Sequence, residues 1–179
     1  MRCGQRGFNL VETVVALSIL AILTALALPS FKGTLERTRT ATALNRLTAT
    51  LSSARSTALM RRQAVSVCPS QEGLTCRKDG IWEDGWIVFV DDKKTGQPAS
   101  SSDILRVAEP LSASLILRAT PGRPRARFQP NGQSTGSTLT LSLCLRNGHR
   151  PLGQVILNNW GRARTVRDPA QDPTCAAAP

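Results

Sequence analysis

The sequence predicts an α+β fold, in which one long N-terminal helix packs on a C-terminal head made of an antiparallel sheet or sandwich. Two observations predict it. From Phe8 to about Arg62 the only proline is Pro29, so one helix of roughly 55 residues can form. From Ala64 onward, short runs of β-branched and aliphatic residues alternate with turns rich in glycine and proline, which is typical of antiparallel sheets.

The N-terminal apolar run extends from Phe8 to Leu28 and carries one charge, Glu12, after two arginines, Arg2 and Arg6. As a helix, a run of this length spans roughly 30 Å, enough to cross a bilayer. The basic flank predicts a cytoplasmic N-terminus, with the remaining chain on the other side of the membrane. The same run also fits a secretory signal peptide cut after Ala27, or an ordinary anchor. Neither alternative explains an acid in the apolar run, where a carboxylate usually has a partner.

The junction itself, Gly7-Phe-Asn-Leu-Val-Glu12, resembles the prepilin signature of type IV pilins and type II secretion pseudopilins. The resemblance implies that a prepilin peptidase cuts between Gly7 and Phe8 and that Phe8 becomes N-methylated. It also implies that Glu12 supports filament assembly by contacting a neighbour's N-terminal amine. The expected partners are then the inner membrane, the prepilin peptidase and other pilins, with the head first in the periplasm and later on a cell-surface pilus.

The helix is expected to have an apolar stripe that packs on the head, because leucines and alanines recur at steps of three and four residues. The stripe consists of Leu44, Leu47, Leu51, Ala54 and Ala58.

The chain is expected to have five segments: a leader 1–7, a transmembrane or filament-core half-helix 8–30, an amphipathic half-helix 31–64, a β-rich head 65–167 and a tail 168–179. The expected strands are 64–68, 86–90, 104–108, 114–119, 126–129, 138–145, 154–157 and 162–167, with a hairpin turn at Asn158–Gly161.

Four of the five cysteines lie beyond the leader, and an even number in an exported domain predicts two disulfides. Of the three possible pairings we favour Cys68–Cys76, which closes a short loop, with Cys144–Cys175, which ties the tail to the head. A metal site is not expected, because His149 is the only histidine and no CxxC pair exists. No cofactor is expected either.

Further motifs occur in order along the chain: Cys68-Pro-Ser, Cys76, Trp82, the run Gly85-Trp-Ile-Val-Phe-Val-Asp91, Phe128, Gly132, Gly136, Cys144 and Gly161-Arg-Ala-Arg164. Together they cover most of the chain and resemble the FimT/GspH branch of minor pilins, most closely FimT. The resemblance implies a type IV pilin-like fold.

Charge is distributed unevenly along the chain, whose formal net charge is +11. Residues 110–167 hold nine arginines and no Asp, Glu or Lys. Such an asymmetry indicates an anionic partner.

An enzyme is not expected. His149 is the only histidine, and no Cys/His or Ser/His catalytic arrangement can be built around it. Four acids could be considered for cation binding: Glu83, Asp84, Asp91 and Asp92. Their spacing matches no EF-hand loop, so they are expected to lie in solvated turns.

The candidate binding residues centre on Arg162 and Arg164. Two residues apart in an expected strand, they would share one face, about 6.6–6.8 Å apart, and each guanidinium can bind a phosphate bidentately. Gly161 is expected to give the turn backbone conformational freedom and to leave room for the close approach of a ligand. Trp160 could stack on a base or pack inward, and we expect it to pack inward. Seven further arginines would extend the surface: Arg118, Arg123, Arg125, Arg127, Arg146, Arg150 and Arg167.

The pattern Gly161-Arg-Ala-Arg164 is similar to the arginine motif associated with DNA binding in FimT-type minor pilins, which act in natural transformation. The resemblance implies contact with DNA phosphates and no reading of sequence. Two alternatives stay open. The chain could be a structural subunit without DNA binding, either a GspH-like pseudopilin of type II secretion or a pilus-tip subunit. It could also be an adhesive module for another anionic polymer.

Overall fold

The structure, a computed structural model, describes residues 9–147, 150–167, 169 and 173–176 of the 179. The expected cleavage site between Gly7 and Phe8 lies outside the described residues, as does His149. The chain divides into two compact units, Met1–Arg39 and Thr40–Pro179.

Helix α1, Leu10–Arg61, begins in the first unit and ends in the second. Its first turn contains Glu12, where a carboxylate interacts favourably with the partial positive charge of the helix N-terminus. The helix continues through Pro29. In the described part of the chain, no helix combines the length and the apolar character needed to cross a membrane.

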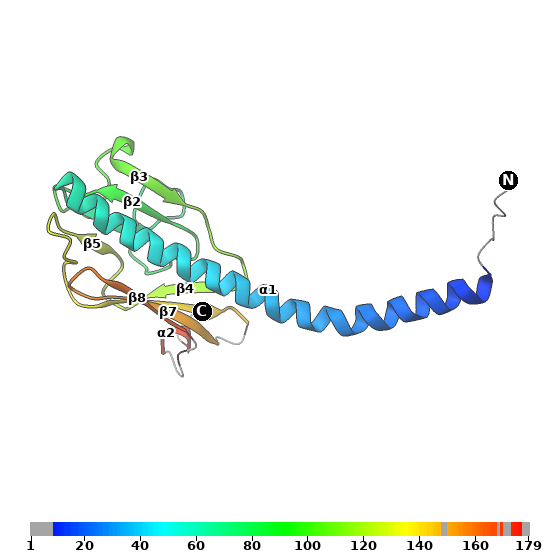
Figure 1. The fold of residues 1–179 in the computed structure, drawn as a ribbon. Coiled ribbons are helices and arrows are strands. Elements are labelled where there is room, and N and C mark those ends of the chain that lie inside the picture. The colour runs from blue at the N-terminus through cyan, green and yellow to red at the C-terminus, as the bar shows by residue number, and fades with distance from the viewer. Residues whose placement is uncertain (1–8, 148–149, 168, 170–172, 177–179) are drawn as a thin grey trace, which may run out of the picture. The chain divides into compact units, whose positions relative to one another are not determined.

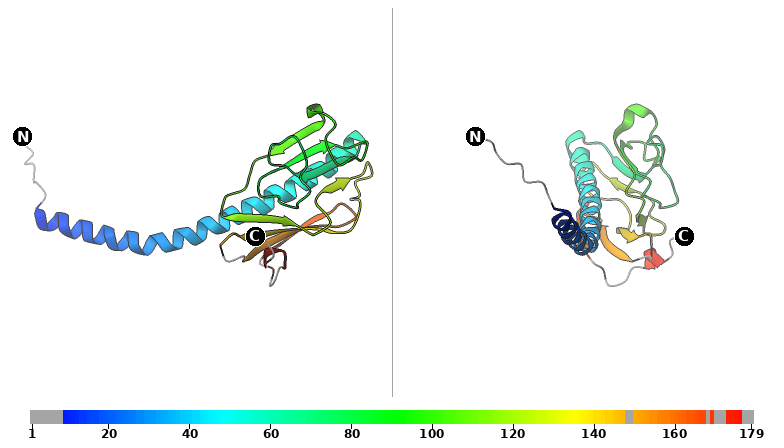
Figure 2. Two further views of the ribbon diagram at one scale, coloured as in Figure 1. Left: turned by 180° about the vertical axis from the view of Figure 1, so that it is seen from behind. Right: turned by 90° about the vertical axis from the view of Figure 1, so that its right-hand side faces the viewer.

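The second part of α1 supplies one side of the head's core. The predicted stripe is confirmed, because Leu44, Leu47, Leu51, Ala54 and Ala58 are all buried. Burying one leucine side chain contributes about 1.5–3 kcal/mol, so this stripe is what holds the helix on the head. In the end-on view of Figure 2, most of the head lies on one side of this part of the helix.

The head contains two four-stranded sheets, and every strand pair in them is antiparallel, as predicted for the α+β class. The first sheet has the order β3-β2-β1-β5, with β1 Val65–Pro69, β2 Trp86–Val90, β3 Ile104–Ala108 and β5 Ala126–Phe128. The second has the order β4-β6-β7-β8, with β4 Leu115–Ala119, β6 Leu139–Leu145, β7 Pro151–Leu157 and β8 Ala163–Arg167. Figure 1 shows α1 crossing both sheets.

One continuous apolar core joins α1 to the inner faces of both sheets. Trp82 and Trp86 are fully buried in it, with ring centroids 6.4 Å apart. The indole nitrogen of Trp86 donates to the hydroxyl of Thr50 on α1, at 3.3 Å. Gly153 on β7 lies under the helix, where a side chain would meet Leu44. The helix is therefore closely packed against the second sheet as well as the first.

Most observed strand boundaries equal those expected or differ by one residue, and the largest difference is at the start of β7. Strand β7 begins at Pro151 rather than residue 154, because its pairing with β6 continues past a register shift at which β7 has one extra residue, Leu152. Proline is tolerated there as the first residue of a strand. Strand β8 begins at Ala163, one residue later than expected. The tail contains a short helix, α2 Pro173–Ala176, that composition did not predict.

Two disulfides hold loops to this framework. Cys68 is bonded to Cys76, and Cys144 is bonded to Cys175. These are the two pairs favoured from the sequence. The second pair has a sequence separation of 31 and brings α2 against the outer face of the second sheet, where Cys175 packs with Ile116 and Cys144.

Candidate nucleic-acid interface

The candidate interface is built on the turn between β7 and β8. The backbone nitrogen of Asn158 donates to the carbonyl oxygen of Arg162, at 3.1 Å, and that of Gly161 donates to the carbonyl oxygen of Asn158, at 2.9 Å. The side-chain oxygen of Asn158 accepts from the backbone nitrogen of Arg162, at 3.0 Å. Asparagine commonly bonds its own turn in this way, so the hairpin tip is well defined.

Gly161 has φ +74°, a conformation that glycine adopts without steric cost. The expectation that it leaves room for a ligand is wrong. Gly161 is buried, and a Cβ atom at this position would collide with the carbonyl oxygen of Gly132. The close approach that needs a glycine is therefore made by the protein's own backbone.

Strand β8 is an edge strand of the second sheet, and three arginines with exposed side chains lie on it or beside it: Arg162, Arg164 and Arg167. Arg164 pairs in register with Ile156, and its neighbour Thr165 faces α1, where its hydroxyl lies 3.0 Å from that of Thr48. Side chains alternate along a strand, so Arg164 points away from the helix. Arg162 precedes the strand, so alternation alone does not fix its direction and the predicted shared face does not follow from the spacing.

Two of the predicted arginines are instead bonded to the turn after β2. Arg127 donates from Nε to the Asp91 carboxylate, at 2.8 Å, and from a terminal nitrogen to the carbonyl oxygen of Lys94, at 2.9 Å. Asp91 is only 1% exposed, so this ion pair is desolvated. Arg125 donates to the carbonyl oxygen of Gly96, at 2.9 Å. Both guanidiniums thus fasten the turn after β2, one to β5 and the other to the residue just before it, and neither presents a free cation.

Arg118 and Arg146 both lie near the buried carboxylate of Glu83. Arg118 is ion-paired with it, and its own side chain is 12% exposed. Arg146 lies 3.8 Å from it and donates to the carbonyl oxygen of Ala113, at 2.8 Å. Arg118 is thus part of the folded framework, whereas Arg146 remains partly exposed beside it.

Arg123, another of the candidate binding arginines, has an unexpected environment. Its two terminal nitrogens are buried, and no hydrogen-bond partner for them exists within residues that the structure describes. Desolvation lowers the pKa of its guanidinium. Arg150 is exposed. The nine arginines of residues 110–167 therefore do not form one exposed surface, because four of them are half-buried against the head: Arg118, Arg123, Arg125 and Arg127.

A polar pocket of about 510 Å³ lies at the β7–β8 turn. It was not predicted, because it draws on α1 and on the loop after β5 as well as on the hairpin. Six residues line it: Arg55, Asn131, Gln133, Asn158, Trp160 and Arg162. None of the six is acidic. Arg55 had no signal in the sequence, since it is one of several bases on the helix.

Trp160 is 67% exposed, so the expectation that it packs inward is wrong. The reason is its position in the turn of the hairpin, next to the buried Gly161. The exposed indole therefore lines the pocket.

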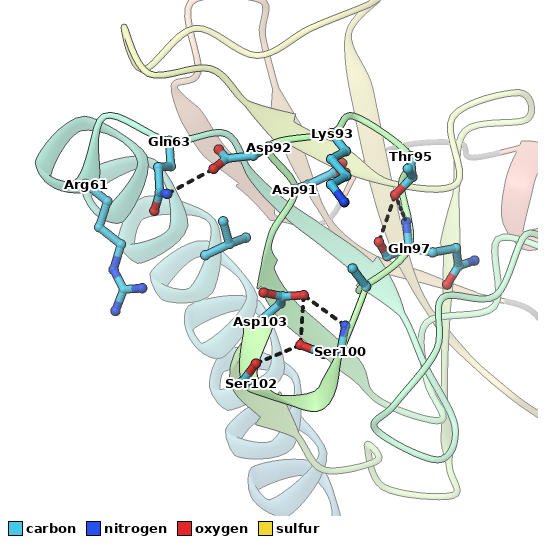
Figure 3. Close-up of a pocket in the computed structure, with 12 residues that line it drawn as sticks. Arg61, Gln63, Asp91, Asp92, Lys93, Thr95, Gln97, Ser100, Ser102 and Asp103 are labelled. Carbon is cyan, nitrogen blue, oxygen red and sulfur yellow. Dashed lines mark hydrogen bonds between the residues drawn. The ribbon is translucent and has the colours of Figure 1, made fainter.

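Another pocket, of about 500 Å³, lies beside the turn after β2 and has mixed charge (Figure 3). Its acids already have partners. Asp92 accepts from Gln63, at 2.9 Å, and Asp103 accepts from the backbone nitrogen of Ser100, at 2.9 Å. Asp91 accepts from Ser66, at 2.7 Å, besides its bond with Arg127. Among the described residues, no group of three His, Cys, Asp or Glu could hold a metal ion.

The expected solvated acids are thus mostly engaged, and Glu83 and Asp91 are buried. Asp84 accepts from Arg77, at 2.6 Å, and Arg77 also bonds Asp79, at 2.5 Å. The hydrogen bond to Asp79 is the main reason that the pKa of Arg77 is raised. Burial opposes the charge on Asp79, but hydrogen bonds from Arg77 and the backbone outweigh it, so the pKa of Asp79 is lowered.

Comparisons with known proteins agree with this fold. Residues 43–161 match the family model described as type II transport protein GspH, and residues 2–28 match the prokaryotic N-terminal methylation motif. No curated protein sequence matches the chain.

Two solved structures illustrate the likeness. The type IV minor pilin FimU of Pseudomonas aeruginosa is 23% identical with a TM-score of 0.60, over 78% of this chain and 97% of that one. The minor pseudopilin EpsH from the type II secretion system of Vibrio cholerae is 12% identical with a TM-score of 0.53, over 74% of this chain and 99% of that one.

Proposed function

The chain belongs to the GspH family of type II transport proteins, and from that premise we propose that it is a minor pilin of the FimT kind whose head binds DNA without sequence preference. Binding of this kind would support DNA uptake in natural transformation. The head would then serve as a binding module and carry no catalytic residues.

The observation that carries the proposal is the set of exposed arginines on and beside the edge strand β8: Arg162, Arg164 and Arg167. Over the stretches that the structure describes, no hydrogen bond or ion pair engages these three guanidiniums. A guanidinium without a carboxylate partner is free to bind phosphate bidentately. Arginines on an edge strand also discourage pairing with another sheet, which keeps the edge open to a different ligand.

The N-terminal segment would deliver the head to the place where DNA is met. The methylation motif covers residues 2–28. We propose that prepilin peptidase cuts between Gly7 and Phe8, that Phe8 is N-methylated, and that Glu12 guides assembly with other pilins. Before assembly the segment would anchor the chain in the inner membrane by a single pass, with the N-terminus cytoplasmic and the head periplasmic. After assembly the head would lie on a pilus at the cell surface.

The direct test is a gel-shift titration of the full chain, kept in a non-ionic detergent, with two DNA duplexes of unrelated sequence. Contacts with phosphates predict similar affinities for the two duplexes. If all three arginines bind phosphate, the slope of log affinity against log salt is about −2.7. Failure to bind at about 50 mM salt, or affinity that does not change up to about 200 mM, would contradict the proposal.

A second candidate is a structural pseudopilin that binds only other pilins. The observation that favours it is the likeness to EpsH, a minor pseudopilin of a type II secretion system, which extends over 99% of that chain. Deletion of the gene separates the two functions. Loss of transformation with normal protein secretion supports the DNA-binding pilin, and the reverse phenotype supports the pseudopilin.

A further inference from the structure

We propose that the pocket at the β7–β8 turn holds an unpaired base of single-stranded DNA, stacked on Trp160, while Arg162 binds the adjoining phosphate. The inference rests on the proposed DNA-binding function and specifies the form of DNA that the head prefers.

The indole of Trp160 is unusual for its exposure. The other two tryptophans, Trp82 and Trp86, are 0% exposed, whereas Trp160 is 67% exposed. An aromatic ring left in water is a surface on which another ring can stack, and every nucleobase has such a face. Because the ring lies beside the exposed Arg162, a stacked base would have its backbone near a free cation.

The lining of the pocket suits a nucleotide better than a protein side chain. Its three amides, on Asn131, Gln133 and Asn158, can each donate and accept hydrogen bonds, so they can meet the polar edge of any base. Its two cations, Arg55 and Arg162, repel a basic partner and attract a phosphate. Its volume of about 510 Å³ is within the usual range for small-ligand sites, roughly 300–1,000 Å³.

The walls of the pocket are held in place without a ligand. Arg55 donates from Nε to the carbonyl oxygen of Gly132, at 3.0 Å, which ties α1 to the loop after β5. The backbone nitrogen of Ser134 donates to the carbonyl oxygen of Asn159, at 2.9 Å, which ties that loop to the hairpin. Asn131 donates to the side-chain oxygen of Gln133, at 3.1 Å. Walls fixed in this way reduce the entropy lost on binding.

A duplex cannot use this pocket, because its bases are paired and stacked on each other. Only an unpaired base, in a single strand or a frayed end, can place its face on an indole. The exposed arginines of β8 can bind phosphates of either form. The pocket therefore adds affinity for single strands on top of a contribution that both forms share.

The test compares two oligonucleotides of about 12 nucleotides, one of thymidines and one of abasic residues, which carry the same phosphates. The full chain in detergent is titrated with each, and affinity is measured together with tryptophan fluorescence. We expect thymidine binding to be about 5- to 100-fold tighter and to change the fluorescence of Trp160. The buried positions of Trp82 and Trp86 make Trp160 the reporter that a ligand reaches.

Two variants make the result specific. Trp160→Ala is expected to remove the preference for thymidine and to leave abasic binding unchanged, while Trp160→Phe retains part of the preference because it keeps an aromatic face. Equal affinities for both probes, with unchanged fluorescence, overturn the stacking site and leave the phosphate contacts intact. An equal loss of both probes in Trp160→Ala also overturns it. Failure of both probes to bind the wild type overturns the proposed function itself.

Discussion

Gly161 lies directly against the carbonyl oxygen of Gly132, so that the hairpin between β7 and β8 meets the loop after β5 with no space for a side chain. The same carbonyl oxygen accepts a hydrogen bond from Arg55 on α1. Three segments distant in the sequence therefore meet at one backbone group. The glycine that precedes the two candidate arginines fixes the position of the hairpin.

Replacing Gly161 by alanine is expected to destabilise the head by more than the backbone conformation alone explains. Gly122→Ala is the matched control, because Gly122 has φ +78° and no atom within 4 Å of an added Cβ. The control should cost about 1–2 kcal/mol of unfolding free energy, and Gly161→Ala should cost more because of the clash. Urea unfolding measures both. Equal losses would show that the contact with Gly132 relaxes easily.

Arg123 and Arg127 should differ in their effect on stability when each is replaced by methionine. Arg127→Met leaves the carboxylate of Asp91, 1% exposed, without its cation, and should cost about 3–5 kcal/mol of unfolding free energy. Arg123→Met removes a cation whose buried terminal nitrogens have no partner in the described chain, and should leave stability unchanged or raise it. Thermal unfolding distinguishes them. A larger loss for Arg123→Met would mean that its guanidinium is satisfied after all.

The two disulfides should contribute different amounts to the free energy of unfolding, because they close loops of different length. Chain-entropy estimates give about 2.5 kcal/mol for Cys68–Cys76, with a separation of 8, and about 3.7 kcal/mol for Cys144–Cys175, with a separation of 31. Replacing each pair by alanines and measuring unfolding free energy tests the order. A costlier loss of Cys68–Cys76 would show that packing around the short loop outweighs loop closure.

Processing of the N-terminus can be checked on protein purified from a host that contains prepilin peptidase. Mass spectrometry of the mature chain should give a start at Phe8 carrying one methyl group. Gly7→Ala should prevent the cut, whereas Gly4→Ala, the matched change within the leader, should not. A start at Leu28 would instead indicate signal peptidase and would remove the basis for filament assembly.

The fold was largely predictable because its strongest signals are local. Strand β2 is a buried apolar run that follows Gly85, and its observed bounds, Trp86–Val90, are those expected. The leucine stripe of α1 follows from periodicity alone. The start of β7 at Pro151 could not be predicted, because its pairing with β6 continues past a register shift at which β7 has one extra residue, Leu152. Helix α2 was missed because four residues have no measurable periodicity.

The site is less predictable than the fold, because ion pairs join residues that lie far apart in the sequence. The segment 110–167, which has no Asp or Glu, lies beside acids from 65–109, so Arg118 pairs with Glu83 and Arg127 pairs with Asp91. No count within one segment reveals those pairs. The pocket at the β7–β8 turn was also beyond the sequence, since Arg55 reaches it from α1.

The most direct test of the account is the salt dependence of DNA binding in the double variant Arg162→Ala with Arg164→Ala. The control is Lys78→Ala with Arg106→Ala, which removes the same charge from exposed positions on other elements. If Arg162 and Arg164 each bind one phosphate, the double variant lowers the slope of log affinity against log salt by about 1.8, while the control leaves this slope unchanged. An unchanged slope in the double variant, or an equal change in the control, would contradict the site.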